Sequence, residues 1–148
     1  KIVIFCYHKS AIHELRVRLA RFNPTFIDGS VNSPVVRKHR ETQFQEDPNC
    51  HIMIGQIDTM GVAITLTAAS EVAVIGPKYT PTDNTQAVLR VHRIGQKRPV
   101  RVRFFYIDNG SDKKLQKTLM RRTQDQAEMF DPLILGSMGR IQNPLEGL

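Results

Sequence analysis

The sequence has 148 residues, 41% of them hydrophobic and 24% charged, and a net charge of +7. This length and composition fit one globular domain, and no apolar run reaches the roughly 20 residues that a membrane-spanning helix needs. Cys6 and Cys50 lack the spaced partners of a zinc site, so we expect buried free thiols and no metal site. No signal peptide is visible, and Lys1 opens directly on an apolar segment, so we expect a piece of a longer intracellular protein.

The first half of the chain alternates short apolar runs with helical patterns. We expect strands at residues 2–6, 25–27 and 51–54, because each is a short apolar run bounded by polar or turn residues. Between the first two strands, Ser10 is expected to cap a helix that ends before Pro24. Ser33 followed by Pro34 predicts the start of a second helix, which runs to about Phe44.

The second half continues the alternation. We expect an irregular segment at residues 55–69, a strand at 71–75, a loop at 76–81 and a strand at 100–107. One helix is expected from a cap at Asp83 to about Arg93, with Gly95 ending it. A last helix, capped by Ser111 or Asp112, is expected to run to Phe130, and residues 131–148 are expected to be a loosely structured tail. The pattern predicts an α/β fold with a parallel sheet and helices on both faces.

Positive charge is concentrated in one stretch of the sequence. Residues 86–122 hold 11 lysines and arginines and only two acids. Such concentration indicates a polyanionic partner, although a solvated basic surface would give the same pattern.

Gln86, Arg90 and Arg93 are spaced as one stripe of a helix, at i, i+4 and i+7. No acid lies at the spacing that would pair with these arginines along the helix. Guanidinium groups are planar, permanently charged and bidentate, so two of them side by side suit a phosphate group.

The segment QAVLRVHRIGQ, residues 86–96, resembles the sixth motif of the Swi/Snf-type DNA translocases of the second helicase superfamily. Other segments resemble that family in the same order. They are residues 1–7; FIDGS at 26–30 with Arg37 and Phe44; Gly61 with LTAA at 66–69; Pro77, Tyr79 and Pro81; and residues 98–102. The resemblance covers about residues 1–130 and implies a helicase C-terminal, RecA-like lobe with a sheet of five to six strands.

The resemblance also implies a function for the lobe. ATP and Mg²⁺ would be held mainly by an N-terminal RecA-like lobe of the same parent chain, and this lobe would supply arginine fingers, Arg93 first and Arg90 second. Nucleotide contacts would come from Gln86, Gly61, Arg90 and Arg93. Contacts to double-stranded DNA would come from Gly29, Ser30, Arg37, Lys38, Gln56, Ile57, Lys113 and Lys117. The parent would be an ATP-dependent, duplex-stimulated translocase that remodels DNA or protein–DNA complexes.

The sequence contains neither a GxxxxGK[ST] loop nor an acidic DExx box, so we expect the 148 residues to be inactive as an ATPase on their own. It also departs from the family pattern around the fifth motif, with Ala63 in place of a glycine and Thr65 in place of an asparagine. In the following loop, Gly76, Tyr79 and Thr80 replace aspartate, tryptophan and asparagine. These changes indicate a divergent member of the family.

Several alternatives remain open at the level of sequence. The lobe could belong to a strand-separating DNA or RNA helicase, or it could be a degenerate nucleic-acid-binding scaffold. A dinucleotide-binding domain is disfavoured because no GxGxxG follows the first strand. Arg37 and Lys38 could equally form the outer face of a helix, and the basic run from Lys113 to Arg122 could meet DNA, the other lobe or water. The parent is expected in the cytoplasm or nucleoid of a microbe or virus, or in the nucleus of a eukaryote.

Overall fold

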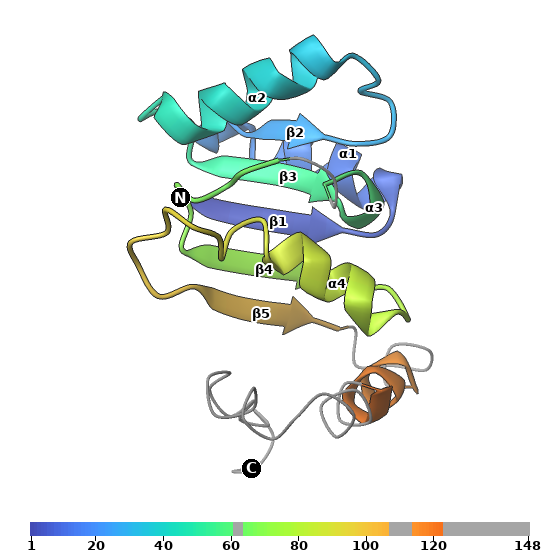
Figure 1. The fold of residues 1–148 in the computed structure, drawn as a ribbon. Coiled ribbons are helices and arrows are strands. Elements are labelled where there is room, and N and C mark those ends of the chain that lie inside the picture. The colour runs from blue at the N-terminus through green and yellow to red at the C-terminus, as the bar shows by residue number, and fades with distance from the viewer. Residues whose placement is uncertain (61–63, 107–113, 123–148) are drawn as a thin grey trace.

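Five parallel strands form the sheet at the centre of the fold (Figure 1). The computed structural model describes residues 1–60, 64–106 and 114–122. The sheet order is β2-β3-β1-β4-β5, with β1 at Ile2–Cys6, β2 at Thr25–Ile27, β3 at Ile52–Gln56, β4 at Glu71–Ile75 and β5 at Arg101–Phe105. Every neighbouring pair is parallel. The α/β fold that the sequence predicts is confirmed.

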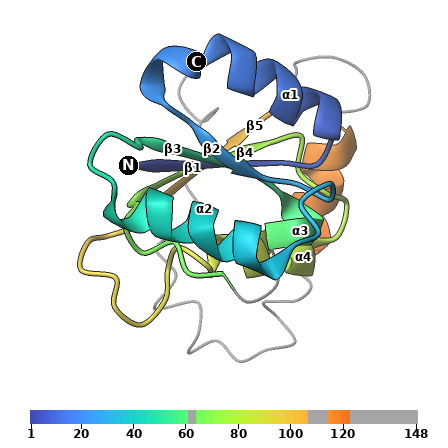
Figure 2. The ribbon, with the colours of Figure 1, turned by 90° about the horizontal axis from the view of Figure 1, so that it is seen from above.

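Helices cover both faces of this sheet, as Figure 2 shows. Helix α1 (Lys9–Arg18), followed by the short 3₁₀ turn Ala20–Phe22, lies on one face. The other face is covered by α2 (Pro34–Glu46), α3 (Ile57–Met60) and α4 (Pro81–Val88).

Alternate residues of β1 point into two separate cores. Val3 and Phe5 pack with residues of α2, α3 and α4, whereas Ile4 and Cys6 pack with residues of α1. Burial on both faces explains why the strand reads as a continuous apolar run instead of an alternating one. Cys6 and Cys50 are both buried and free, as the sequence predicts.

Helix α2 begins where the sequence predicts. The Ser33 side chain accepts a hydrogen bond from the Val36 amide at 3.5 Å, and Pro34 is the first helical residue. The helix continues to Glu46, slightly beyond the predicted end near Phe44.

Two of the predicted helix caps are wrong. Helix α1 begins at Lys9, so His8 holds the capping position and Ser10 lies inside the first turn. Helix α4 begins at Pro81 with Thr80 before it, so Asp83 also lies inside a first turn. Proline explains the second case, because its fixed φ and missing N–H suit the first helical position.

The predicted end of α4 is wrong as well. The helix stops at Val88 instead of continuing to Arg93, and the amides of Arg90 and Val91 then bond the carbonyls of Ala87 and Val88, three residues back. The Arg90 carbonyl is used outside the helix, where it accepts the Leu66 amide at 2.9 Å. This tertiary bond helps to explain why the chain leaves the helix early. Gly95, with a φ of +101°, lies in a later turn and is not the cap of a helix.

The segment between β3 and β4 holds α3, a short helix that the sequence analysis did not predict. Met60 folds back onto Gly55, where a Cβ would overlap the Met60 side chain. The glycine at this position therefore allows α3 to turn sharply against the end of its own strand.

The last described elements lie at the far edge of the sheet. β5 spans Arg101–Phe105 at the edge of the sheet, and Phe104 and Phe105 are 44% and 51% exposed. Residues 114–122 are helical, as the sequence predicts, and Leu115 and Leu119 on this helix are buried. The predicted cap at Ser111 or Asp112, the helix end at Phe130 and the tail at 131–148 lie outside the described residues. None of the described helices is long and apolar enough to cross a membrane.

Candidate functional site

The carboxyl ends of β1, β2 and β3 meet at one edge of the sheet, and the side chain of Gln56 links the loops that follow them. Its Oε1 accepts the Gly29 amide at 3.1 Å and the Thr59 hydroxyl at 3.4 Å. Its Nε2 donates to the Tyr7 carbonyl at 3.5 Å. Gln56, predicted as a DNA contact, is thus engaged within the lobe and fixes the position of the Gly29 turn.

The turn at Gly29 and Ser30 is exposed and lies beside a cation. Asp28 Oδ1 accepts the Ser30 amide at 2.9 Å and the Ser30 hydroxyl at 2.5 Å. Partial burial raises the pKa of Asp28, but the bonds from Ser30 and nearby cations such as Lys9 outweigh burial and leave the pKa below its ordinary value. A Cβ on Gly29 would come within 3.2 Å of the Lys9 amine. The Gly29 and Ser30 amides are both used within the lobe, so the Lys9 amine is the donor that this exposed turn could offer a phosphate oxygen, and no sequence pattern had singled out Lys9.

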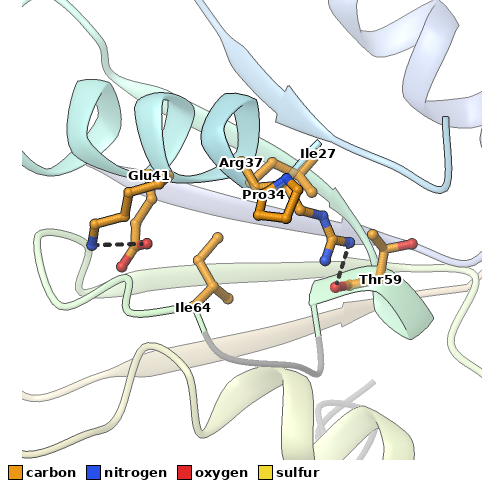
Figure 3. A pocket seen from close by; sticks show the side chains of 7 residues that line it. Ile27, Pro34, Arg37, Glu41, Thr59 and Ile64 are labelled. Carbon is orange, nitrogen blue, oxygen red and sulfur yellow. Dashed lines mark hydrogen bonds and ion pairs between the residues drawn. The ribbon is translucent and has the colours of Figure 1, made fainter. Parts of the chain in front are cut away.

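Arg37 and Lys38 line a pocket of about 270 Å³ between α2 and α3 (Figure 3). Its walls are Ile27, Pro34 and Ile64 on the apolar side and Arg37, Lys38, Glu41 and Thr59 on the polar side. Arg37 is partly buried and donates to the Thr59 carbonyl at 3.2 Å. The Lys38 side chain is 71% exposed, and its amine lies 3.2 Å from Glu41 Oε2. Arg37 thus braces α3, whereas Lys38 remains accessible from outside.

The arginine segment does not form the single helical stripe that the sequence predicts. Gln86 is exposed on α4, but Arg90 and Arg93 lie in the turns that follow the helix. Arg93 is exposed and donates to the Thr65 hydroxyl at 3.3 Å, next to the contact between the Leu66 amide and the Arg90 carbonyl. The Arg93 side chain and the Arg90 backbone therefore both contact the segment at residues 65–66, whereas Gln86 lies on the helix before this turn.

Helix α2 holds residues 65–68 from one side. Glu41, only 8% exposed, accepts the Thr65 amide at 3.0 Å. One turn later, Gln45 accepts the Ala68 amide at 2.7 Å. Their i, i+4 spacing shows only that they share a helix face, since their partners lie more than 20 residues away in the sequence. Sequence reasoning therefore missed both residues.

Gln96 holds the same segment from the other side. Its Nε2 lies within hydrogen-bonding distance of the carbonyls of Thr67 (3.2 Å), Ala69 (2.6 Å) and Val91 (3.2 Å). Arg98 adds a bond to the Ala68 carbonyl at 2.8 Å. Residues 65–69 and the arginine turn consequently form one hydrogen-bonded unit.

The remaining predicted site residues are Ile57, Lys117, Gly61 and Lys113. Ile57 is 1% exposed, so its side chain is closed to a ligand and any contact must use its backbone. Lys117 is exposed on the helix at 114–122, which is tethered to the lobe by a 2.8 Å bond from Arg122 to the Tyr79 carbonyl. Gly61 and Lys113 lie outside the described residues. In the described ranges no three His, Cys, Asp or Glu residues gather as metal ligands would.

Comparison with known proteins places the chain among helicase domains. The family model described as the helicase conserved C-terminal domain matches residues 1–95. The DNA repair protein RAD5A of Arabidopsis thaliana is 31% identical over 124 residues, which are 82% of this chain and 12% of that protein. The ATP-dependent helicase rhp16 of Schizosaccharomyces pombe is 32% identical over 84% of this chain and 14% of its own length. The DNA excision repair protein ERCC-6-like of Bos taurus is 41% identical over 80% of this chain and 9% of its own length.

A solved structure agrees with the fold. The crystal structure of the C-terminal part of the Fun30 ATPase domain superposes with a TM-score of 0.75 at 24% sequence identity, over 80% of this chain and 38% of that one. The chain thus spans only a small part of the curated relatives, about a tenth of their length.

Proposed function

Because the chain belongs to the helicase conserved C-terminal domain family and its relatives are SNF2-family proteins, we propose that it is the second lobe of an ATP-dependent motor on double-stranded DNA. The parent protein would translocate along duplex DNA and remodel DNA or protein–DNA complexes. DNA repair and helicase functions in the names of the relatives support a location where DNA is found, the nucleus in a eukaryote.

The observation that carries the proposal is the contact of the arginine turn with residues 65–66, through the Arg93 side chain and the Arg90 backbone. Arg93 is exposed, and its guanidinium lies 3.3 Å from the Thr65 hydroxyl, while the Arg90 backbone is fixed by the Leu66 amide. A planar cation held at the rim of a lobe can reach a phosphate bound by a facing lobe and offset the charge that develops during phosphoryl transfer. Arg93 would be the first finger and Arg90 the second, with Gln86 and Gly61 as further nucleotide contacts.

The chain fits only one half of such a site. The arginines suit the phosphates of ATP, but the sequence lacks the loop that cradles a triphosphate and the acidic box that holds Mg²⁺. ATP and Mg²⁺ would therefore be held mainly by the N-terminal RecA-like lobe of the parent, and the lobe alone would not turn over ATP.

The proposed DNA surface begins at the carboxyl edge of the sheet. The Lys9 amine beside the exposed Gly29–Ser30 turn and the exposed Lys38 amine offer cationic donors for phosphate oxygens, and the close approach that Gly29 allows would bring a DNA backbone near them. Arg37, Gln56, the Ile57 backbone and Lys113 and Lys117 complete the proposed set. Contacts of this kind are independent of base sequence and weaken steeply as salt rises.

The test is the ATPase activity of the full-length parent without DNA, with single strands and with duplex. We expect stimulation by duplex, and a fall in kcat of roughly 10³–10⁵ for Arg93→Ala, as for arginine fingers in related motors. Arg18→Ala is the matched control, because Arg18 is an exposed arginine on α1 on the opposite face of the sheet. Stimulation by single strands instead of duplex would favour a strand-separating helicase. Duplex binding without ATPase activity would favour a scaffold.

A further inference from the structure

Lys78 lies between two helices that no sequence pattern connects to it. Its amine is 2.5 Å from Asp58 Oδ1 on α3 and 2.6 Å from Asp83 Oδ2 in the first turn of α4. The lysine side chain is 21% exposed, whereas those of Asp58 and Asp83 are 48% and 35% exposed. A single, largely covered cation thus joins two carboxylates from separate helices.

The backbone of Lys78 is fixed as firmly as its amine. The side chain of Asn84, 4% exposed, accepts the Lys78 amide at 3.0 Å and donates to the Lys78 carbonyl at 2.8 Å. Because Asn84 belongs to α4, these two bonds attach the Lys78 backbone to that helix. The Lys78 amine, at the other end of the side chain, contacts Asp58 on α3.

The two joined helices belong to the two halves of the proposed site. On the α3 side, Thr59 receives Arg37 on its carbonyl and bonds Gln56 through its hydroxyl, so α3 is part of the proposed DNA surface. On the other side, α4 leads directly into the turns that carry Arg90 and Arg93. Lys78 therefore connects the helix next to the DNA contacts with the helix next to the arginines.

We propose that Lys78 is a positioning residue that transmits the presence of duplex DNA from α3 to the arginine fingers through Asp58 and Asp83. The inference rests on the proposed function and names the link between its two sites. Lys78 touches neither substrate in this scheme, and its effect passes through the placement of α3 against α4.

Removal of the amine has a clear physical consequence. Both carboxylate oxygens lie within 2.6 Å of one nitrogen, so they are close to each other and repel once the cation is gone. The pKa of Lys78 is raised well above its ordinary value, first by the hydrogen bond to Asp58 and then by that to Asp83, so the amine is charged throughout the neutral range. Met is a suitable replacement because it keeps an unbranched apolar stem of similar length and lacks the charge.

The experiment uses the full-length parent and compares four variants with wild type. Lys78→Met removes the cation, and Lys78→Arg keeps it. The double variant Asp58→Lys with Lys78→Asp exchanges the charges of this pair, so it restores the ion pair between positions 58 and 78 but leaves the carboxylate at position 78 facing Asp83. Lys97→Met is the matched control, since Lys97 is an exposed lysine that forms no ion pair with the described residues. ATPase rates with and without duplex, duplex affinity and thermal stability are measured for each.

For Lys78→Met we expect the DNA-free rate and the duplex affinity to stay within about twofold, while the stimulation by duplex falls roughly 5- to 10-fold, within the range found for mutations that alter coupling between sites. Lys78→Arg should recover most of the stimulation. The charge-exchanged double variant should recover part of it, because only the ion pair between positions 58 and 78 is restored, and Lys97→Met should behave like wild type. Recovery by the double variant would support an electrostatic link, because each of its substitutions alone would leave like charges facing one another.

Two results would overturn the inference. Full duplex stimulation in Lys78→Met would show that the link is not needed. A loss that follows thermal stability across all variants, and is not recovered by the double variant, would assign Lys78 a merely structural role. A wild-type parent that duplex does not stimulate would instead overturn the proposed function, and the inference with it.

Discussion

Replacing Gln96 should remove several of the hydrogen bonds that hold the arginine turn against residues 67–69 and should lower the stability of the lobe. The Gln96 Nε2 faces three carbonyls at 2.6–3.2 Å, but an amide nitrogen carries only two hydrogens, so at most two of these contacts are full hydrogen bonds. Its Oε1 accepts a further bond from the Arg98 amide at 3.0 Å. The Gln96 side chain therefore makes three hydrogen bonds, two from Nε2 and one to Oε1, and these are lost when it is replaced by leucine.

The expected loss of stability follows from that count. At about 0.5–1.5 kcal/mol for each hydrogen bond, Gln96→Leu removes roughly 1.5–4.5 kcal/mol. Gln96 is only partly buried, so water can reach some of the abandoned carbonyls, and we expect about 2–3 kcal/mol. For a domain of this size, that corresponds to a fall in Tm of roughly 4–12 °C.

Urea unfolding and thermal melting of the 148-residue chain measure this loss. Gln96→Glu is the sharper variant, because it keeps the shape of the side chain but replaces the NH₂ donor with a carboxylate oxygen. That oxygen faces the three carbonyl oxygens and is repelled by them. We expect it to be at least as destabilising as Gln96→Leu at neutral pH. Gln43→Leu serves as control, since no side-chain hydrogen bond of Gln43 is found in the described part of the chain. If Gln96→Leu and Gln96→Glu both unfold within about 0.5 kcal/mol of wild type, the hydrogen-bond reasoning is refuted.

Three further predictions concern the rest of the lobe. Burial raises the pKa of Cys6 to about 11 and also raises that of Cys50, so a thiol reagent at pH 8 should label both only at the rate of unfolding, and fast labelling of native protein would contradict this. Asp28 has a lowered pKa, so the stability that it adds is present above its ordinary value of 3.8 and is lost as the pH falls through the folded value. Asp28→Asn should therefore destabilise by about 1 kcal/mol at pH 7 and progressively less in acid, as pH-dependent urea titration would detect. Phe44, a fully buried residue of α2, should lower the free energy of unfolding in urea by roughly 3–5 kcal/mol when replaced by alanine, and a loss below about 1 kcal/mol would mean that the core closes over the gap.

The sequence predicts the strands and α2 well because their signals are local. Apolar runs in β1, β3 and β4 reflect burial on both faces of the sheet. Ser33 followed by Pro34 is itself the cap and first residue of α2, so the helix start can be read from adjacent residues. The end of α4 has no such signal. Residues 89–93 contain neither glycine nor proline, and the helix stops where the Arg90 carbonyl bonds Leu66, a contact across more than 20 residues that no local pattern reveals.

The candidate site shows the same division. Arg90 and Arg93 were predicted from their rare spacing and from the motif around them, and their role as fingers stays a prediction. In the structure the Arg93 side chain bonds Thr65 and the Arg90 carbonyl accepts the Leu66 amide. Glu41 and Gln45, which hold residues 65–68, and Lys78, which joins α3 to α4, could not be found from sequence. Each acts through a partner 20 or more residues away, so only the folded chain brings the pairs together.

The central place of β1 in the sheet has a consequence for the order of folding. Ile2 pairs with Ile52 on one side and with Glu71 on the other, so β1, which precedes both neighbours in the sequence, must wait for them before it can pair. During synthesis its apolar residues stay unpaired until β3 has emerged, and β4 and β5 must then add to the other edge. Such non-local pairing slows folding and leaves an apolar, aggregation-prone strand exposed for longer. The growing chain should therefore depend on chaperones most strongly before residue 56 has left the ribosome.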